Sequence, residues 1–317
     1  MNTHTRILKT GALAIAMTVV FAIFAFRAAE WTKGLDSEFI VYGQGSGGST
    51  GTSGTGGSTG SSTTKVVAQI ASGNFGDIEP RNYGTVMEIV NPGTTAVTVS
   101  GNFYNENGTA ATAVPFASNA SNLTITNGSF SNYSLAAGAI LVISTGTTAS
   151  TTPAVGTTTW GKFTSSAPVS VTSFFELRHS LTRGLFARVG VPASRADLGS
   201  FVVARVREKQ NNEGTRAGFA DIDTGFALVN TGTATSAVTI TIKDANGATI
   251  GTKAIALTAG QHIANFTSLL FSDLAETAGL GRQYQYVRFD ASPATIAAAG
   301  LSIEGGSLSS FPVDAVQ

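Results

Sequence analysis

Two pairs of carboxylate residues are the best candidates for chemistry in this sequence. Asp221 and Asp223 lie two residues apart in the stretch DIDTG, and Asp77 and Glu79 lie two apart in the stretch GDIEP. Calcium takes six to eight oxygen ligands, many of them from loop carboxylates. The four residues therefore suggest a calcium site, and the alternative is that they are solvated acidic residues in loops.

Three short patterns resemble parts of hydrolase active sites, and each lacks what its chemistry requires. Residues 223–225 read Asp-Thr-Gly, but an aspartic protease needs a second carboxylate beside the first. Residues 47–51 fit G-x-S-x-G without the strand and helix of a nucleophile elbow. His179 has Glu176 and Ser180 nearby in sequence, but a catalytic triad cannot be inferred from such proximity. The sequence favours a protein that is not an enzyme.

Aromatic side chains at alternating positions suggest a second kind of site. Trp160 is followed by Gly161 in a segment of alternating side chains, and Tyr284 and Tyr286 stand on either side of Gln285. Exposed rings on a sheet face can stack against sugars, so these three aromatic residues are candidates for glycan binding. Aromatic residues are also common in strands as buried packing partners. Exposure of all three rings would favour the first interpretation.

Composition excludes several classes of site. Charged residues make up 12% of the 317 residues and the formal net charge is zero, which gives no basic surface for nucleic acid. The absence of cysteine excludes disulfides, zinc ribbons and thiol nucleophiles. Only three histidines occur, so a histidine-rich metal site is excluded as well. One of them, His262, lies in the stretch QHIANF and is expected to face solvent or a rim.

The N-terminus has the pattern of an export signal. Residues 1–30 contain Arg6 and Lys9, then an uncharged apolar run over residues 11–26. This predicts either a cleaved signal peptide or a retained membrane anchor. Residues 31–64 form a spacer and a Gly/Ser/Thr linker, which predicts a flexible tether. The rest of the chain is expected outside the cytoplasm, secreted, periplasmic or at the cell surface.

Short segments rich in Val, Ile, Thr and Phe follow, separated by Gly, Asn, Ser and Pro. Residues 238–243 alternate apolar and polar side chains, as a strand with one buried face does. Asn246 and Gly247 then form the dipeptide of a tight hairpin. Residues 268–282 predict one or two helical turns. The predicted fold class is all-β, built from antiparallel sandwiches.

The same pattern occurs twice. Residues 88–108 read EIVNPGTTAVTVSGNFYNENG, and residues 227–247 read ALVNTGTATSAVTITIKDANG. Both copies later contain a Leu-x-Ala-Gly turn, and the first carries an extra polar insert at residues 117–134. We therefore predict two β-sandwich domains, at residues 65–198 and 199–317. The insert is a candidate contact surface, with an additional hairpin as the alternative.

The repeated pattern V-x-N-x-G…A-V-T-V/I…N-G…L-x-A-G…S-x-P-V resembles the tandem immunoglobulin-like or fibronectin-III-like β-sandwich modules of secreted or surface bacterial proteins. The resemblance is carried by residues 90–99 with 167–171, and by residues 229–242 with 292–296. It implies a structural or surface role and supplies no catalytic residue. No cofactor is expected, apart from the calcium considered above.

Together these observations predict a non-enzymatic, exported structural or adhesive protein that presents two immunoglobulin-like modules. The alternative is a carbohydrate-binding module that uses Trp160, Tyr284 and Tyr286. Its partners would be other surface proteins or glycans, with membrane anchoring through the N-terminus as a further option.

Overall fold

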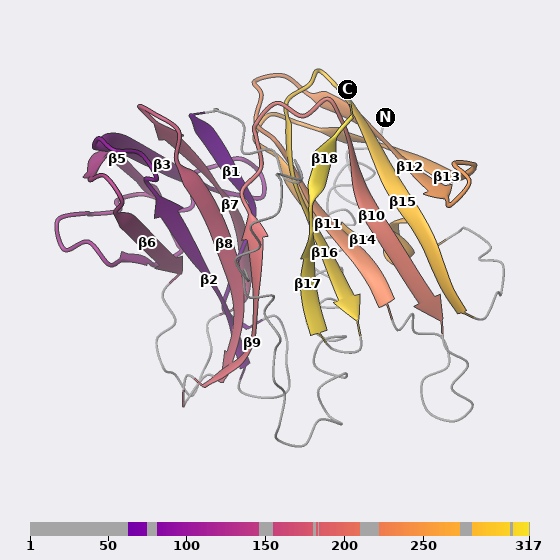
Figure 1. The fold of residues 1–317 in the computed structure, drawn as a ribbon, viewed down its shortest axis with the longest axis horizontal. Helices are drawn as coiled ribbons and strands as arrows, with labels where there is room; N and C mark the ends of the chain where they lie inside the picture. The colour runs from indigo at the N-terminus through magenta and orange to yellow at the C-terminus, as the bar shows by residue number, and fades with distance from the viewer. Residues whose placement is uncertain are drawn as a thin grey trace, which may run out of the picture.

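The computed structural model describes residues 63–74, 81–145, 155–179, 182, 184–209, 222–272, 281–304 and 307–316. The described chain is all-β, as predicted, and its strands pair antiparallel in open sheets. Figure 1 shows the strands in two groups side by side, with the N-terminal strands in indigo to magenta and the C-terminal strands in orange to yellow. The predicted N-terminal apolar segment and tether, residues 1–30 and 31–62, lie outside the described residues.

The N-terminal group, here called unit 1, forms two sheets. Their strand orders are β1-β7-β3-β5 and β4-β6-β2-β8-β9. The strand bounds are β1 Thr64–Ser72, β2 Arg81–Val90, β3 Val97–Asn105, β4 Phe116–Ser118, β5 Ser129–Leu135, β6 Ile140–Thr145, β7 Thr157–Ser165, β8 Ser170–His179 and β9 Leu185–Pro192.

The C-terminal group, unit 2, forms one sheet in the order β13-β12-β15-β10-β11-β16-β17, with β14 on β11 and β18 on β10. β10 and β11 share a single register pair, Glu208 with Ile222, so the sheet divides there into two layers. The bounds are β10 Ser200–Lys209, β11 Ile222–Asn230, β12 Ser236–Asp244, β13 Thr249–Leu257, β14 His262–Phe266, α2 Thr267–Leu270, β15 Gly281–Ser292, β16 Ile296–Glu304, β17 Ser307–Phe311 and β18 Val313–Ala315.

The two units share one pairing scheme. In unit 1, β3 pairs with β5 and β7, β7 with β1, β2 with β6 and β8, and β8 with β9. In unit 2, β12 pairs with β13 and β15, β15 with β10, β11 with β14 and β16, and β16 with β17. The repeated sequence pattern therefore corresponds to a repeated topology.

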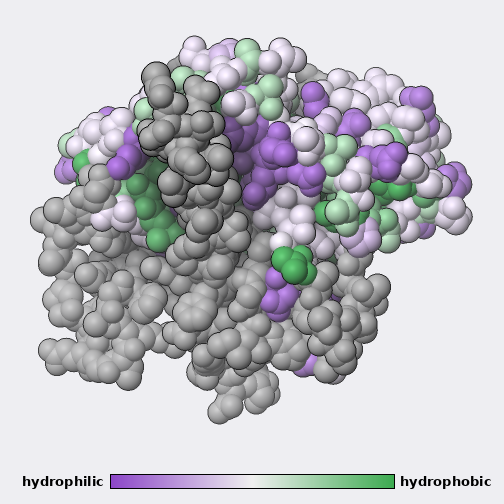
Figure 2. All heavy atoms as spheres, turned by 180° about the vertical axis from the view of Figure 1, so that it is seen from behind, coloured by the Kyte–Doolittle hydropathy of each residue, from purple (hydrophilic) through white to green (hydrophobic). Residues whose placement is uncertain are grey.

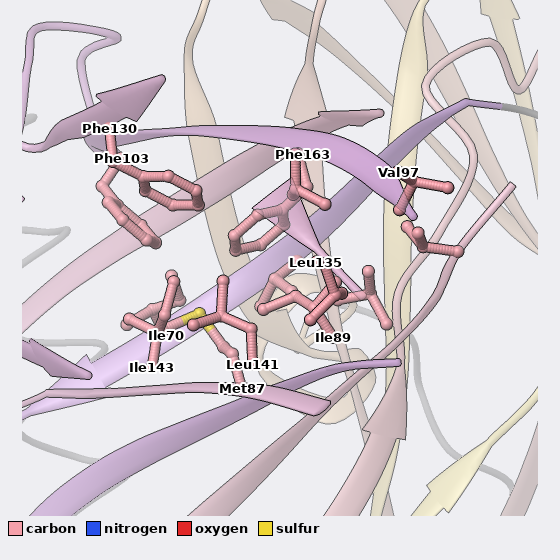
Figure 3. Close-up of a cluster of buried hydrophobic side chains, with 14 of the residues drawn as sticks. Ile70, Met87, Ile89, Val97, Phe103, Phe130, Leu135, Leu141, Ile143 and Phe163 are labelled. Atoms are coloured by element: carbon pink, nitrogen blue, oxygen red, sulfur yellow. The ribbon is translucent and has the colours of Figure 1, made fainter. Parts of the chain in front are cut away.

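Each unit packs its two layers around an apolar core, an arrangement consistent with a β-sandwich. In β12, Val238, Ile240 and Ile242 are buried while Thr239 is exposed, as the alternation predicts. Figure 3 shows the core of unit 1, where rings from one sheet point toward aliphatic side chains from the other. The rings are Phe103, Phe130 and Phe163, and the facing side chains include Met87, Leu141 and Ile143.

A third apolar cluster lies between the units. Unit 1 contributes buried side chains from β1, β7, β8 and β9, and unit 2 contributes them from β11 and β16. Its members are Val66, Ala68, Ala71, Trp160, Phe175, Val189, Val191, Ala227, Val229, Ala297 and Ala299. Burying this much apolar surface favours a fixed arrangement of the two units over independent motion.

In each copy of the repeat, the asparagine of Val-Asn-x-Gly is buried, and its side chain forms hydrogen bonds with several backbone groups. We call this arrangement the clasp. Asn91 is fully buried, and its Nδ2 donates to the carbonyl oxygens of Thr95 (2.8 Å), Leu135 (3.1 Å) and Ala136 (3.0 Å). Its Oδ1 accepts a hydrogen bond from the Gly93 amide at 3.0 Å. One side chain thus joins the β2–β3 turn to the end of β5.

The same clasp occurs in unit 2. The Nδ2 of the fully buried Asn230 donates to the carbonyl oxygens of Ala234 (2.7 Å), Leu257 (2.9 Å) and Thr258 (3.2 Å). Its Oδ1 accepts from the Gly232 amide at 3.0 Å. An amide is the side chain that supplies both two N–H donors and an oxygen acceptor, which explains why the sequence repeats asparagine here.

Both predicted Asn-Gly turns are present and equivalent in the two units, with positive φ at the glycine but not at the preceding asparagine. Gly108 and Gly247 both have φ +82°, the left-handed region that glycine tolerates without steric penalty. The predicted helix at residues 268–282 begins as α2 at Thr267 and ends at Leu270, and residues 273–280 lie outside the described part. Among the described residues, no helix has the length and apolarity needed to span a membrane.

The clasp leads to a stability prediction. Asn230→Asp replaces the donating amide by an acceptor and leaves three carbonyl oxygens facing a buried carboxylate. We expect the free energy of unfolding to fall by on the order of 3 kcal/mol, measured by urea denaturation. Asn246→Asp, at an exposed turn, is the control and should change it by less than about 0.5 kcal/mol. Equal losses in the two variants would contradict a structural role for the clasp.

Candidate functional site

Trp160 does not form part of an exposed aromatic platform. Its side chain is 3% exposed, because the outer face of β7 is covered by unit 2. The ring stacks on Tyr104, with 4.3 Å between centroids, and Nε1 donates to the carbonyl of Gly260 at 3.1 Å. The prediction of glycan stacking is therefore wrong for this residue, and its role is to join the two units.

The other two predicted aromatic residues lie on the outer face of unit 2. Tyr284 is 62% exposed and Tyr286 is half-buried, and both alternate along β15 with the buried Val287. Farther along the same face, Arg288 and Asp290 form an ion pair at 2.8 Å. This face retains two of the three predicted rings, far from Trp160 in the pairing order of the sheets.

Asp223, the described member of the predicted calcium set, is engaged by hydrogen-bond donors. Its Oδ1 accepts from the Thr224 amide (2.9 Å) and the Thr267 hydroxyl (3.2 Å), and its Oδ2 accepts from the Ser268 hydroxyl. Burial raises the pKa of this carboxyl, while the Ser268 hydrogen bond and the Arg205 charge oppose the shift. Asp223 therefore already has three hydrogen-bond donors directed at its carboxylate.

Asp223 belongs to a polar network enclosed within one end of unit 2. The Arg205 side chain is 4% exposed, and its Nε donates to the Thr267 hydroxyl at 2.8 Å. Arg205 also donates to the side-chain oxygen of Gln285. The network links β10, β11, α2 and β15 and satisfies charges that burial would otherwise disfavour.

The other predicted calcium residues, Asp77, Glu79 and Asp221, lie outside the described residues. Within the described ranges, no group of three or more histidine, cysteine or acidic side chains is arranged to hold a metal ion. Calcium binding therefore remains a prediction of the sequence.

His179 is not part of a triad with Glu176. Both oxygens of the buried Glu176 carboxylate face arginines, Oε2 at 2.7 Å from Arg178 Nε and Oε1 at 3.4 Å from Arg188 Nε. The Nδ1 atom of His179 accepts a hydrogen bond from the Thr182 amide at 3.2 Å. Glu176 thus serves an ion-pair cluster on the outer face of β8 and β9.

His262 lies at the junction of the two units, and the expectation that it faces solvent or a rim is wrong. The side chain is 1% exposed, and its Nε2 lies 2.8 Å from Oε1 of Gln69 in β1. Because that oxygen only accepts, Nε2 carries the proton, and Nδ1 is left without a hydrogen-bond partner among the described residues. The His262 amide also donates to the carbonyl of Glu106 at 2.8 Å.

The junction holds the imidazole in its neutral form. Burial lowers the pKa of His262 from 6.5 to about 3. The nearest carboxylate is that of Glu106, 3.9 Å from Nδ1, and burial raises the pKa of this group. Both shifts have the same cause, which is the removal of water from the contact between the units.

Two grooves mark the described surface. The first, of about 480 Å³, runs between the units and is mostly apolar, with side chains such as Val191 and Phe311. Two cationic side chains line this groove. Arg195 already forms an ion pair with Asp197 at 2.7 Å, and Lys65 is buried, with 8% of its surface exposed. Burial, followed by the Arg195 charge, lowers the pKa of Lys65.

The second groove, of about 700 Å³, lies beside β5 and the segment at residues 122–126. It is lined by serine, threonine and asparagine with a few apolar side chains. Most of the lining belongs to the polar insert at residues 117–134 that the sequence singles out, whereas Ser100 and Asn102 on β3 were not predicted. They could have been predicted from the alternation along β3, which places Ser100 and Asn102 on the outward face of the strand.

The described part of the face seen from behind is largely polar. It is mostly purple or near-white, with green confined to small patches (Figure 2).

No family model, curated protein sequence or solved structure matches this chain. The function must therefore be inferred from the site geometry.

The junction predicts an acid sensitivity that depends on His262. Between pH 6.5 and about 3 the unfolded chain binds a proton that the buried ring does not, so stability falls as pH falls. Relative to His262→Gln, the wild type should lose about 2–3 kcal/mol more between pH 7 and pH 4.5, measured by urea denaturation. Glu106, whose pKa is raised, has the opposite dependence and is common to both proteins.

His179→Gln, outside the junction, is the matched control and should retain the wild-type acid sensitivity. Equal acid sensitivity of the wild type and His262→Gln would show that the junction does not hold the ring neutral.

Proposed function

We propose that this protein is a non-enzymatic, exported structural or adhesive protein that presents two immunoglobulin-like β-sandwich modules as one stiff body. The export signal and tether are those expected from residues 1–64 of the sequence. In this proposal the tether, about 25 Å in mean span, holds the body away from the surface to which it is attached.

The observation that carries the proposal is the continuous apolar contact between the units. A chain of modules connected only by a linker would bend at each connection. Here Trp160, Val229 and Ala297 are buried together, and Gln69 of β1 contacts His262 of β14. Such a body suits presentation or load-bearing better than catalysis, because its buried polar groups are used to stabilise packing.

Two glycines of the repeat show how closely the units meet. A Cβ on Gly108 would lie 2.9 Å from the Cα of Gly260, and a Cβ on Gly260 would lie 2.8 Å from the Cα of Gly108. Their counterparts in the other unit, Gly247 and Gly138, have no heavy atom within 4 Å of such a Cβ. The turn at Gly108 in unit 1 therefore packs against the turn at Gly260 in unit 2. The equivalent glycines, Gly247 and Gly138, have no such neighbour.

The alternative, a carbohydrate-binding module with a row of sheet-face aromatic residues, retains Tyr284 and Tyr286 but loses Trp160 to the junction. Two rings on one strand give less stacking surface than the row of three expected from the sequence.

A matched pair of substitutions tests the stiff body. Gly247→Ala and Gly108→Ala introduce the same positive-φ strain, about 1–2 kcal/mol, but only Gly108→Ala clashes with the other unit. We expect Gly108→Ala to lose at least about 1 kcal/mol more in urea denaturation and to increase the radius of gyration in small-angle scattering. Identical behaviour of the two variants would show that the units are not rigidly joined.

Export is tested by cell fractionation with N-terminal sequencing of the full-length chain. We expect the protein outside the cytoplasm, either beginning near residue 26 or 30 after cleavage or retaining Met1 as an anchored form. Recovery in the cytoplasmic fraction alone would overturn the proposed role.

A further inference from the structure

We propose that the groove beside β5 binds a neutral oligosaccharide. This inference does not depend on the structural role proposed above, because it rests on the chemistry of the groove itself. The groove measures about 700 Å³, within the roughly 300–1,000 Å³ that small-ligand sites occupy. It is lined by β5, by the segment at residues 122–126 and by Ser100 and Asn102 of β3.

The lining carries no charged side chain. Its polar members are amides and hydroxyls, which both donate and accept hydrogen bonds, as sugar hydroxyls do. A charged ligand would bury its charge here without a counter-ion, which is unfavourable. The lining therefore selects a neutral ligand with many hydroxyl groups.

Several of these side chains have hydrogen-bonding capacity to spare. Asn102, Asn122 and Ser131 make no side-chain hydrogen bond to any other part of the chain that the structure describes, although all three line the groove. Asn102 is half-buried on β3, and the other two are exposed. Polar groups held at a concave surface without internal partners can bind a ligand without first breaking internal hydrogen bonds.

Apolar contact is also available. Tyr133 and Leu123 line the groove and are half-buried, since both also pack against the core of unit 1. A side chain fixed by the core is a rigid surface for the C–H face of a sugar ring, and a tyrosine ring provides a large contact area. Amides and hydroxyls together with a few such contacts form the lining expected for an oligosaccharide.

The edge of β5 argues against the main competing occupant, an extended peptide added as a further strand. Strand addition needs a regular edge of backbone donors and acceptors. Asn132 has φ +54°, and the β3–β5 register shifts between Val99 and Gly101, so the edge is irregular in its middle. Such irregularities discourage pairing with another strand.

Only unit 1 has the elements that build this groove. In unit 2, β12 and β13 are joined by residues 245–248 alone. In unit 1, β3 and β5 are separated by residues 106–128, which include the segment at residues 122–126 that lines the groove. The position on β12 equivalent to Asn102 is Thr241, as the two Asn-Gly turns show by their common spacing. Unit 2 therefore supplies a control site within the same molecule.

The experiment titrates the full chain with three neutral trisaccharides, maltotriose, cellotriose and triacetylchitotriose, up to about 10 mM, by isothermal calorimetry. We expect at least one to bind. Asn102→Ala and Asn122→Ala should each weaken that binding about tenfold, the effect of one lost hydrogen bond of about 1.4 kcal/mol, with an unchanged melting temperature. Thr241→Ala should bind as the wild type does.

Three outcomes would overturn the proposal. They are no heat of binding with any of the three sugars, binding that neither asparagine variant weakens, and binding that Thr241→Ala weakens equally. A fourth titration, with a neutral extended peptide of alternating serine and valine, tests strand addition, and tighter binding of the peptide than of the sugars would also overturn it.

Discussion

Two buried asparagine side chains determine how each half of this protein closes. Asn91 and Asn230 each bring three backbone carbonyl oxygens to one amide, at the place where the turn after one strand meets the end of another. These carbonyl groups lie beside the apolar core, where an unpaired oxygen would be costly. The amide satisfies them and at the same time sets the spacing between the two layers at that rim. The clasp therefore explains why the sequence repeats Val-Asn-x-Gly: the repeated asparagine stabilises the fold of each unit.

The duplication then becomes unequal. The hairpin at Gly108 and the turn at Gly260 meet backbone to backbone, while their counterparts at Gly247 and Gly138 have no neighbour within reach. The outer face of β7 is covered at the junction, whereas the outer face of β15 leaves Tyr284 exposed. The extra segment before β5 likewise exists in one copy only. Any function that differs between the two units must arise from these differences, because their pairing scheme is shared.

Residues that suggest chemistry in the sequence mostly stabilise packing in the structure. Asp223 accepts hydrogen bonds from a backbone amide and two hydroxyls inside unit 2, and Glu176 is held by two arginines. His262 is a neutral ring between the units, with its pKa lowered by burial. The buried carboxylates of Asp223 and Glu176 thus both have partners, and two of the partners of Asp223, Thr267 and Ser268, lie more than 40 positions away in sequence.

Local pattern was enough to predict the all-β class and the two Asn-Gly turns, because these depend on period-two alternation and on the φ preferences of glycine. The segment predicted as an insert, residues 117–134, instead contains most of β5, the counterpart of β13. Local pattern also predicted which residues share a face of a strand. It could not predict which outer face is covered by the other unit, since the alternation of Trp160 with its neighbours is the same whether that face meets solvent or protein. For the same reason His262 was expected at the surface and lies buried against Gln69, 193 positions away in the chain. Contacts between surfaces so distant in sequence leave no periodic trace, so they become visible only when the chain is folded.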